Sequence, residues 1–148
     1  MKLTEVKKAC ISLLQSKYKK EYKYYSSMVV EDYQRPCFFT QLKVTTDEPI
    51  NFNTRYKRAN FYITIMQKTP DEAKAMEMID EIEEMFGLAV KVKDRTAKVT
   101  GFEYDFIGTK GNIPEITVEL EWCSEIAHEE ETEVIEEVIM TDTLEMEV

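Results

Sequence analysis

The sequence has few of the residues that catalytic and metal-binding sites usually require. It has one histidine, His128, and three cysteines, Cys10, Cys37 and Cys123, which are far apart and form no CxxC pair. An odd number of separated cysteines argues against a disulfide framework and a zinc site, so we expect buried free thiols. Because His128 lies in an acidic segment, a Ser-His-Asp or Cys-His site would need a catalytic residue outside the core. We therefore predict a non-enzyme with no catalytic residue, no cofactor and no metal site.

Glycine is also scarce, and four residues cannot supply a dinucleotide-binding fingerprint. The segment from Gly101 to Lys110 resembles a phosphate loop only in composition, because its spacing is wrong and no helix is predicted after it. Glu115, Glu119 and Glu121 alternate on one face of a predicted strand, where they could gather a cation. We favour the interpretation that this is a solvated sheet face.

Long hydrophobic runs are missing as well. No segment approaches the ~18 apolar residues of a transmembrane helix. The first five residues include Lys2 and Glu5, where a signal peptide would have its apolar region, so we expect cytoplasmic synthesis and no membrane partner. With 148 residues, 43% of them hydrophobic, the chain is sufficient for one domain with an ordinary core.

Basic residues are absent from segment 124–148, so charge is unevenly distributed. Residues 1–68 hold 13 basic and 6 acidic residues, a net charge of +7, although the whole chain has −10. Segment 124–148 holds ten of the 29 acidic residues, which leaves 19 acidic and 19 basic residues in 1–123. Those ten are Glu125, Glu129, Glu130, Glu131, Glu133, Glu136, Glu137, Asp142, Glu145 and Glu147. Such asymmetry suggests contact with another surface, within the chain or between chains.

Hydrophobic periodicity predicts an α+β fold with the element order α-β-β-β-α-β-β-β. We expect a first helix from a Thr4 cap to about Tyr18 and a second from a Thr69 capping box to Gly87. The predicted strands are 24–30, 36–44, 59–66, 88–93, 99–106 and 116–123. This order predicts a largely antiparallel or mixed β-sheet with two helices packed on one face. We place the domain at 1–123 and an acidic C-terminal tail or docking arm at 124–148.

Alternation predicts which side chains form the core. In strand 36–44, which begins with Pro36, Phe38 lies on the opposite face from Phe39. The second helix has an apolar stripe, and strand 88–93 places Leu88 with its two valines on one face. Gly101 suggests a β-bulge. The stripe of the second helix consists of Ala75, Met78, Ile79, Ile82, Met85 and Phe86.

Two segments have an additional functional interpretation. Segment 45–58 is longer than most hairpin connections, and long ordered loops are often functional, so we expect a projecting loop at Asp47–Arg58. The lysine- and tyrosine-rich segment 17–25 could bind nucleic acid through phosphates and base stacking. The alternative, which we favour, is a helix end leading into a strand with packed tyrosine rings.

The acidic segment 124–148 leaves two interpretations open. It is a solubilising tail, or it adds a strand or short helix to a neighbouring subunit, with alternating Leu144, Met146 and Val148 as contacts.

Several stretches together resemble the tail terminator family of contractile-tailed phages and phage-like bacteriocin particles. They are Leu3–Ala9, Val30–Asp32, Arg35–Leu42 and Arg55–Phe61, followed by the next strand and the closing strand. The resemblance implies a structural subunit of a homo-oligomeric, hexameric ring that caps the tail tube, stops its growth and contacts the sheath and the neck or collar. It implies assembly in the host bacterial cytoplasm and a final position at the head-proximal end of the tail.

The partner contacts that we expect lie in two places. One set is in the projecting loop, and the other is the C-terminal alternation. The loop residues are Asn51, Phe52, Arg55, Tyr56, Lys57 and Arg58, and the C-terminal residues are Leu144, Met146 and Val148. No sequence-specific nucleic-acid partner is expected. Two rival functions remain: a head–tail connector of the neck, and an inhibitory protein whose acidic tail mimics nucleic acid.

Overall fold

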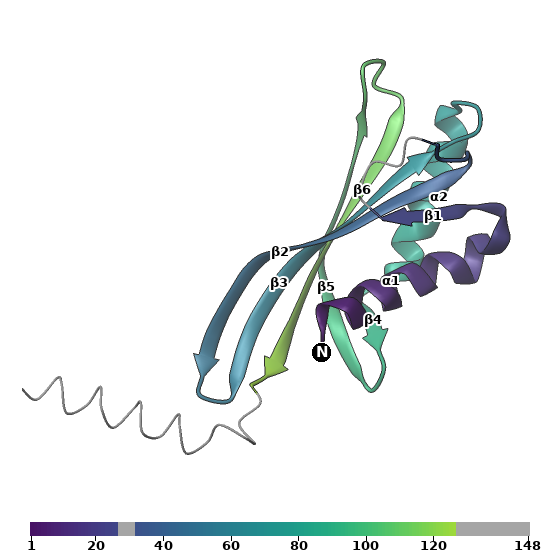
Figure 1. The fold of residues 1–148 in the computed structure, drawn as a ribbon. Helices are drawn as coiled ribbons and strands as arrows, with labels where there is room; N and C mark the ends of the chain where they lie inside the picture. Colours follow the sequence, from purple (N-terminus) through teal and green to yellow (C-terminus); the bar gives the residue numbers. More distant parts are fainter. Residues whose placement is uncertain (27–31, 127–148) are drawn as a thin grey trace, which may run out of the picture.

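The computed structural model describes residues 1–26 and 32–126, and it confirms the predicted α+β fold. Two helices lie on one face of a six-stranded mixed sheet (Figure 1). The elements are α1 (Leu3–Tyr18), the 3-10 turn η1 (Lys19–Glu21), β1 (Lys23–Ser26), β2 (Cys37–Asn51), β3 (Thr54–Met66), α2 (Glu72–Phe86), β4 (Ala89–Val92), β5 (Arg95–Ile107) and β6 (Ile113–Glu125).

The strand order in the sheet is β1-β2-β3-β6-β5-β4. Only β1 and β2 run parallel, and the other neighbours are antiparallel. The predicted strand 24–30 is observed as β1, which begins at Lys23 and is described to Ser26; residues 27–31 lie outside the described part of the chain. The closing strand β6 ends at Glu125.

The core forms where the helices cover the sheet. Helix α1 buries Val6, Cys10, Leu14 and Tyr18, which recur at every fourth position and therefore lie on one face of the helix. Its cap differs from the prediction, because the helix begins at Leu3 and Thr4 lies inside it. The Glu5 carboxylate instead accepts a hydrogen bond from the Lys2 backbone N–H at 3.0 Å, which satisfies a donor at the helix start.

Helix α2 buries its predicted stripe, with Ala75, Met78, Ile79, Ile82 and Phe86 in the core and Met85 packed at its margin. Gly87 ends the helix at φ +55°, as predicted. The predicted Thr69 cap is wrong: Asp71 is the cap residue, and its carboxylate accepts from Lys74 N at 3.2 Å. The Gln67 side chain hydrogen-bonds the backbone N–H and C=O of Asp71, so the helix starts two residues later than the capping-box motif suggests.

Three of the four tyrosines of segment 17–25, Tyr18, Tyr22 and Tyr24, pack in or against the core, whereas Tyr25 stacks on Phe39 on the other face of the sheet. Tyr18 and Tyr22 are buried, and the Tyr22 ring stacks on Phe38 with centroids 4.7 Å apart. Tyr24 stacks on the same Phe38 ring at 5.6 Å, and burial raises the pKa of Tyr22 and of Tyr24. These ring contacts agree with the interpretation of this segment as a helix end leading into a strand with packed tyrosine rings.

Of the side chains predicted to be buried, Cys123 and Leu88 are exposed. Cys10 and Cys37 are buried, and burial raises the pKa of the Cys10 thiol to about 12. Cys123 is exposed because it alternates with Trp122 and so lies on the face of the sheet away from the helices. Leu88 is 88% exposed because strand β4 begins after it, at Ala89.

Candidate assembly surfaces

The most prominent feature outside the core is a β-arm, which we define as residues 45–58 of β2 and β3 together with residues 121–126. The arm extends beyond both helices (Figure 1). Residues 51 and 54 pair across a two-residue turn, in which Asn53 N donates to Asn51 Oδ1 at 2.8 Å. Ile126 N donates to Asn53 O at 2.9 Å, so the end of β6 is fastened to the turn.

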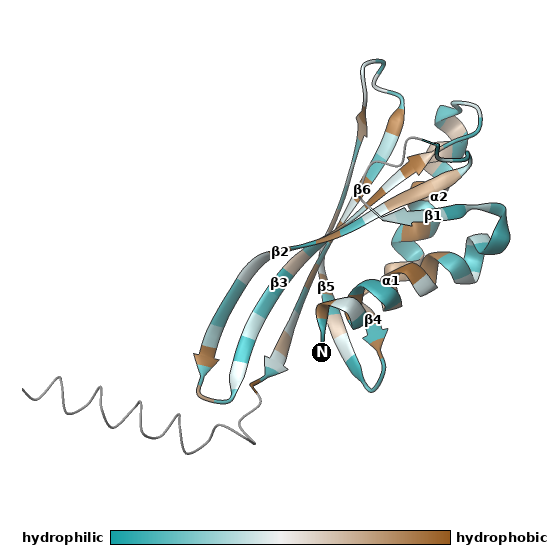
Figure 2. Cartoon of the chain, in the orientation of Figure 1, coloured by the Kyte–Doolittle hydropathy of each residue, from teal (hydrophilic) through white to brown (hydrophobic). Residues whose placement is uncertain are grey.

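The predicted loop at Asp47–Arg58 is therefore wrong, and this segment continues the β2–β3 hairpin. Thr46 pairs with Arg58 and Pro49 with Arg55, while the other edge of β3 pairs with β6 from Thr54 to Thr64. The backbone of β3 is thus hydrogen-bonded on both sides. Because the helices leave residues 45–58 unburied, this segment needs no apolar alternation, and its sequence is as polar as that of a loop (Figure 2).

Two of the predicted contact residues, Arg55 and Lys57, lie on the side of the arm that faces helix α1. They pair across the sheet with Ser124 and Trp122, whose strand buries its even-numbered residues. Arg55 Nε donates to Asp47 Oδ1 at 2.8 Å, and this hydrogen bond lowers the pKa of Asp47.

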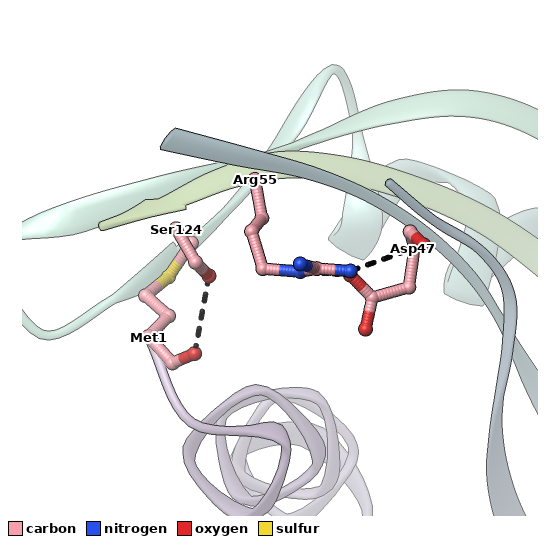
Figure 3. A network of polar contacts seen from close by, with 4 residues as sticks. All are labelled: Met1, Asp47, Arg55 and Ser124. Atoms are coloured by element: carbon pink, nitrogen blue, oxygen red, sulfur yellow. Dashed lines mark hydrogen bonds and ion pairs between the residues drawn. The ribbon is translucent and has the colours of Figure 1, made fainter. Parts of the chain in front are cut away.

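Beside this pair, the Ser124 hydroxyl donates to the carbonyl of Met1 at 3.4 Å (Figure 3). Strand β6 of the arm is therefore hydrogen-bonded to the residues just before α1.

Tyr56 and Arg58 lie on the opposite side of the arm. The Tyr56 hydroxyl donates to Glu121 Oε2 at 2.6 Å, and this contact raises the pKa of Tyr56. Among the described residues, neither Arg58 nor Lys57 has an ion pair within 4.0 Å. Arg58 is exposed and Lys57 partly exposed, so both can meet a partner without breaking an internal salt bridge.

The tip of the arm carries exposed apolar side chains. Ile50 is 57% exposed and Phe52 is 47% exposed, next to Asn51 at the end of β2. Figure 2 shows the change from hydrophilic residues along the arm to hydrophobic residues at the end of β2. All six predicted loop residues thus lie on the β-arm. The other three, Leu144, Met146 and Val148, lie outside the described residues, as does His128.

The face of the sheet away from the helices is divided by charge. Its β5–β6 half is acidic, whereas Lys43 of β2 and Arg58 of β3 lie on the other half. The acidic side chains are Glu103, Asp105, Glu115, Glu119 and Glu121. The sequence placed three of them, Glu115, Glu119 and Glu121, on one strand face. Only the strand order shows that this strand lies next to β5 and that β3 separates it from β2.

Three of these acidic residues each contact a different residue of a neighbouring strand. Glu115 contacts the Thr64 hydroxyl at 3.5 Å, and Glu121 lies 3.9 Å from Lys98. The Glu119 carboxylate lies over Gly101, where a Cβ atom would come within 2.5 Å of it. Across residues 1–26 and 32–126, no group of three or more histidine, cysteine or carboxylate side chains is placed to hold a metal ion.

Two edges of the sheet were not recognised from the sequence. Strand β1 covers β2 only from Cys37 to Thr40, and β4 covers β5 only from Arg95 to Lys98. Within the described residues, β2 from Gln41 pairs only with β3 and β5 from Thr100 pairs only with β6, so the outer edge of each has no strand beside it. Finding these edges needs the sheet order, which local periodicity does not contain. None of the described helices has the length and apolar character to cross a membrane.

Comparison with known proteins gives one informative match. No curated protein matches the sequence significantly. Several solved structures match, and one of them aligns with a TM-score of 0.49 and 10% identity over 86% of this chain and 97% of its own length, a similarity too weak to inform function. The profile of the family described as phage tail terminator protein matches residues 5–133, which include α1 from Glu5, all of α2, the whole sheet and the arm. The chain belongs to the phage tail terminator protein family, and its role is a structural one in the phage tail.

Proposed function

We propose that the protein forms a hexameric ring that caps the tail tube, ends its growth and contacts the last sheath ring and the neck or collar. This places it at the head-proximal end of a contractile tail or of a bacteriocin particle with such a tail. Membership of the tail terminator family supports the proposal. The β-arm is the observation that carries the contact with the tube.

The arm suits this contact for three reasons. It projects beyond the helical layer, so its tip reaches a neighbour before the body of the domain does (Figure 1). Its backbone is paired with β6 and tied to the turn through Ile126, so little conformational entropy is lost on docking. It carries exposed Ile50 at its tip, and Lys57 and Arg58 lie further along β3 on opposite faces, neither with an ion pair among the described residues, so the arm offers both apolar contact and charge.

The test is complementation of a phage or bacteriocin locus from which this gene has been removed. We expect tubes of uncontrolled length without the protein and normal tails with the wild type. A variant with Ile50→Glu and Arg58→Glu should fold but leave tails long, because it places charge at the apolar tip and reverses the free cation. Met76→Glu is the matched control, since Met76 is 46% exposed on α2, away from the arm. Normal tails from the arm variant would refute the arm contact.

A further inference from the structure

We infer that neighbouring subunits join edge to edge, with β2 of one copy paired antiparallel to β5 of the next. This inference rests on the proposed ring and names the surfaces that build it. Among residues 1–26 and 32–126, no strand pairs with the outer edge of β2 over Gln41–Val44, the segment before the bulge, or with the outer edge of β5 over Gly101–Ile107. Strand edges with free backbone donors and acceptors are templates for pairing with another chain.

The direction of the two strands fits a ring. Because β2, β3, β6 and β5 are successively antiparallel, β2 and β5 run in opposite directions. A rotation about an axis along the strands changes neither the strand direction nor the face of the sheet. The neighbour's β5 would therefore lie antiparallel to β2, and the helices of both subunits would lie on the same side of the joined sheet. The contact joins two different surfaces of the subunit, as a closed ring requires.

The faces of the two edges limit the register. Leu42 and Val44 lie on the helix side of β2, and Phe102, Tyr104 and Phe106 lie on the helix side of β5. In a continuous sheet, residues that pair across the contact must lie on the same face. Under this condition the segment Gln41–Val44 can pair with Gly101–Ile107 in two registers. In one Lys43 lies opposite Glu103, and in the other it lies opposite Asp105. Both registers place a cation against a carboxylate and aliphatic side chains against aromatic rings.

One hydrogen bond selects between these registers. The Phe106 backbone N–H already donates to Asp105 Oδ1 at 2.8 Å, which closes that end of the β5 edge. We therefore assign the register that ends at Asp105, with Lys43 opposite Glu103, Leu42 opposite Tyr104 and Val44 opposite Phe102. Tyr104, which is 57% exposed in the single chain, would then be covered by the neighbour.

The remainder of the β2 edge is protected against wrong pairing. After the bulge at Thr45 the strand contains Asp47, Glu48 and Pro49, and charged residues and proline are common means of preventing edge association. The pairing surface is thereby confined to the segment before the bulge.

Disulfide cross-linking of the full chain tests the register. The variant is Lys43→Cys with Glu103→Cys in a Cys123→Ser background, which removes the exposed native thiol and keeps the buried ones. Within one subunit β3 and β6 separate β2 from β5, a distance of about 14 Å, so a disulfide between these cysteines must join two chains. We expect oxidised rings to run as covalent multimers on non-reducing gels. Lys43→Cys with Glu83→Cys, on the exposed face of α2, is the control that should stay uncrosslinked.

Charge reversal gives a second readout that needs no new disulfide. Lys43→Glu should raise the dissociation constant of the ring contact about fivefold, and adding Glu103→Lys should restore it. Rings that form without the Lys43–Glu103 cross-link and without charge rescue would overturn this inference and leave the ring proposal intact. A chain that stays monomeric alone and with tube protein would overturn both.

Discussion

Thr45 and Thr100 occupy the extra positions of two β-bulges that flank a single row of the sheet. The row is Val44–Ala59–Leu120–Val99, and the register shifts immediately beyond Val44 in β2 and beyond Val99 in β5. Each threonine hydroxyl donates to a carbonyl of the adjacent strand, Thr45 to Arg58 at 3.3 Å and Thr100 to Glu119 at 3.4 Å. Since a bulge bends its strand and increases the local twist, this row is where the arm turns away from the core.

Deleting Thr45 should straighten the arm without unfolding the domain. Thr46 would follow Val44 directly and still pair with Arg58, so no side chain beyond the deletion changes face. We expect a change of about 1 kcal/mol or less in the free energy of unfolding and loss of tail-length control. Chemical denaturation and electron microscopy of tails measure the two effects. Thr45→Ser, which keeps the hydroxyl and the bulge, is the control. Wild-type tail lengths from the deletion variant would show that the bend is dispensable.

The neighbouring residues Phe38 and Phe39 should differ sharply in their contribution to stability. Phe38 is fully buried among the rings of Tyr18, Tyr22 and Tyr24, so Phe38→Ala should cost about 3–5 kcal/mol. Phe39 lies on the open face and contacts Tyr25 and Tyr33, so Phe39→Ala should cost about 1 kcal/mol. Urea denaturation measures both. Equal losses would contradict the assignment of the two sheet faces.

Glu5 should make stability depend on acidic pH. Its hydrogen bonds to Lys93 and to the Lys2 backbone hold the pKa of the carboxyl at about 2, below its ordinary value of 4.5. The folded form therefore favours the ionised carboxylate, and that stabilisation is present above pH 4.5 and lost as pH falls towards 2. We expect Glu5→Gln to melt below the wild type at neutral pH, with the difference disappearing over that window.

Thermal denaturation followed by circular dichroism measures this difference. Glu77→Gln, on the exposed face of α2, is a control that should show no such pH dependence. A constant gap between Glu5→Gln and wild type from pH 7 to pH 2 would show that ionisation of Glu5 is not its source.

The acidic C-terminal segment can be tested by truncation after Ile126. The cut belongs there because Ser124 and Glu125 are part of β6 and Ile126 is bonded to the turn of the arm. If the segment docks sheath or collar, tubes of correct length should accumulate without sheath, seen by electron microscopy. Sheathed particles at normal yield would favour a solubilising tail instead.

The sequence by itself determined the elements that have one buried face. The stripe from Ala75 to Phe86 and the alternation from Ile116 to Trp122 appear in the structure as predicted, and Gly87 and Gly101 mark a helix end and a bulge. Periodicity predicts such elements because a helix or strand that packs on one side must repeat its apolar residues at its own geometric period.

Only the tertiary structure decided that residues 45–58 are strands. The pairing of β3 in this segment depends on β6, more than sixty residues later in the chain, and none of residues 45–58 is buried. The outer edges of β2 and β5 that no described strand covers, and the exposure of Cys123, likewise follow from the strand order and from which face the helices cover. Local sequence records the burial of a side chain, but it does not record which strand satisfies a backbone hydrogen bond, because every residue offers the same N–H and C=O.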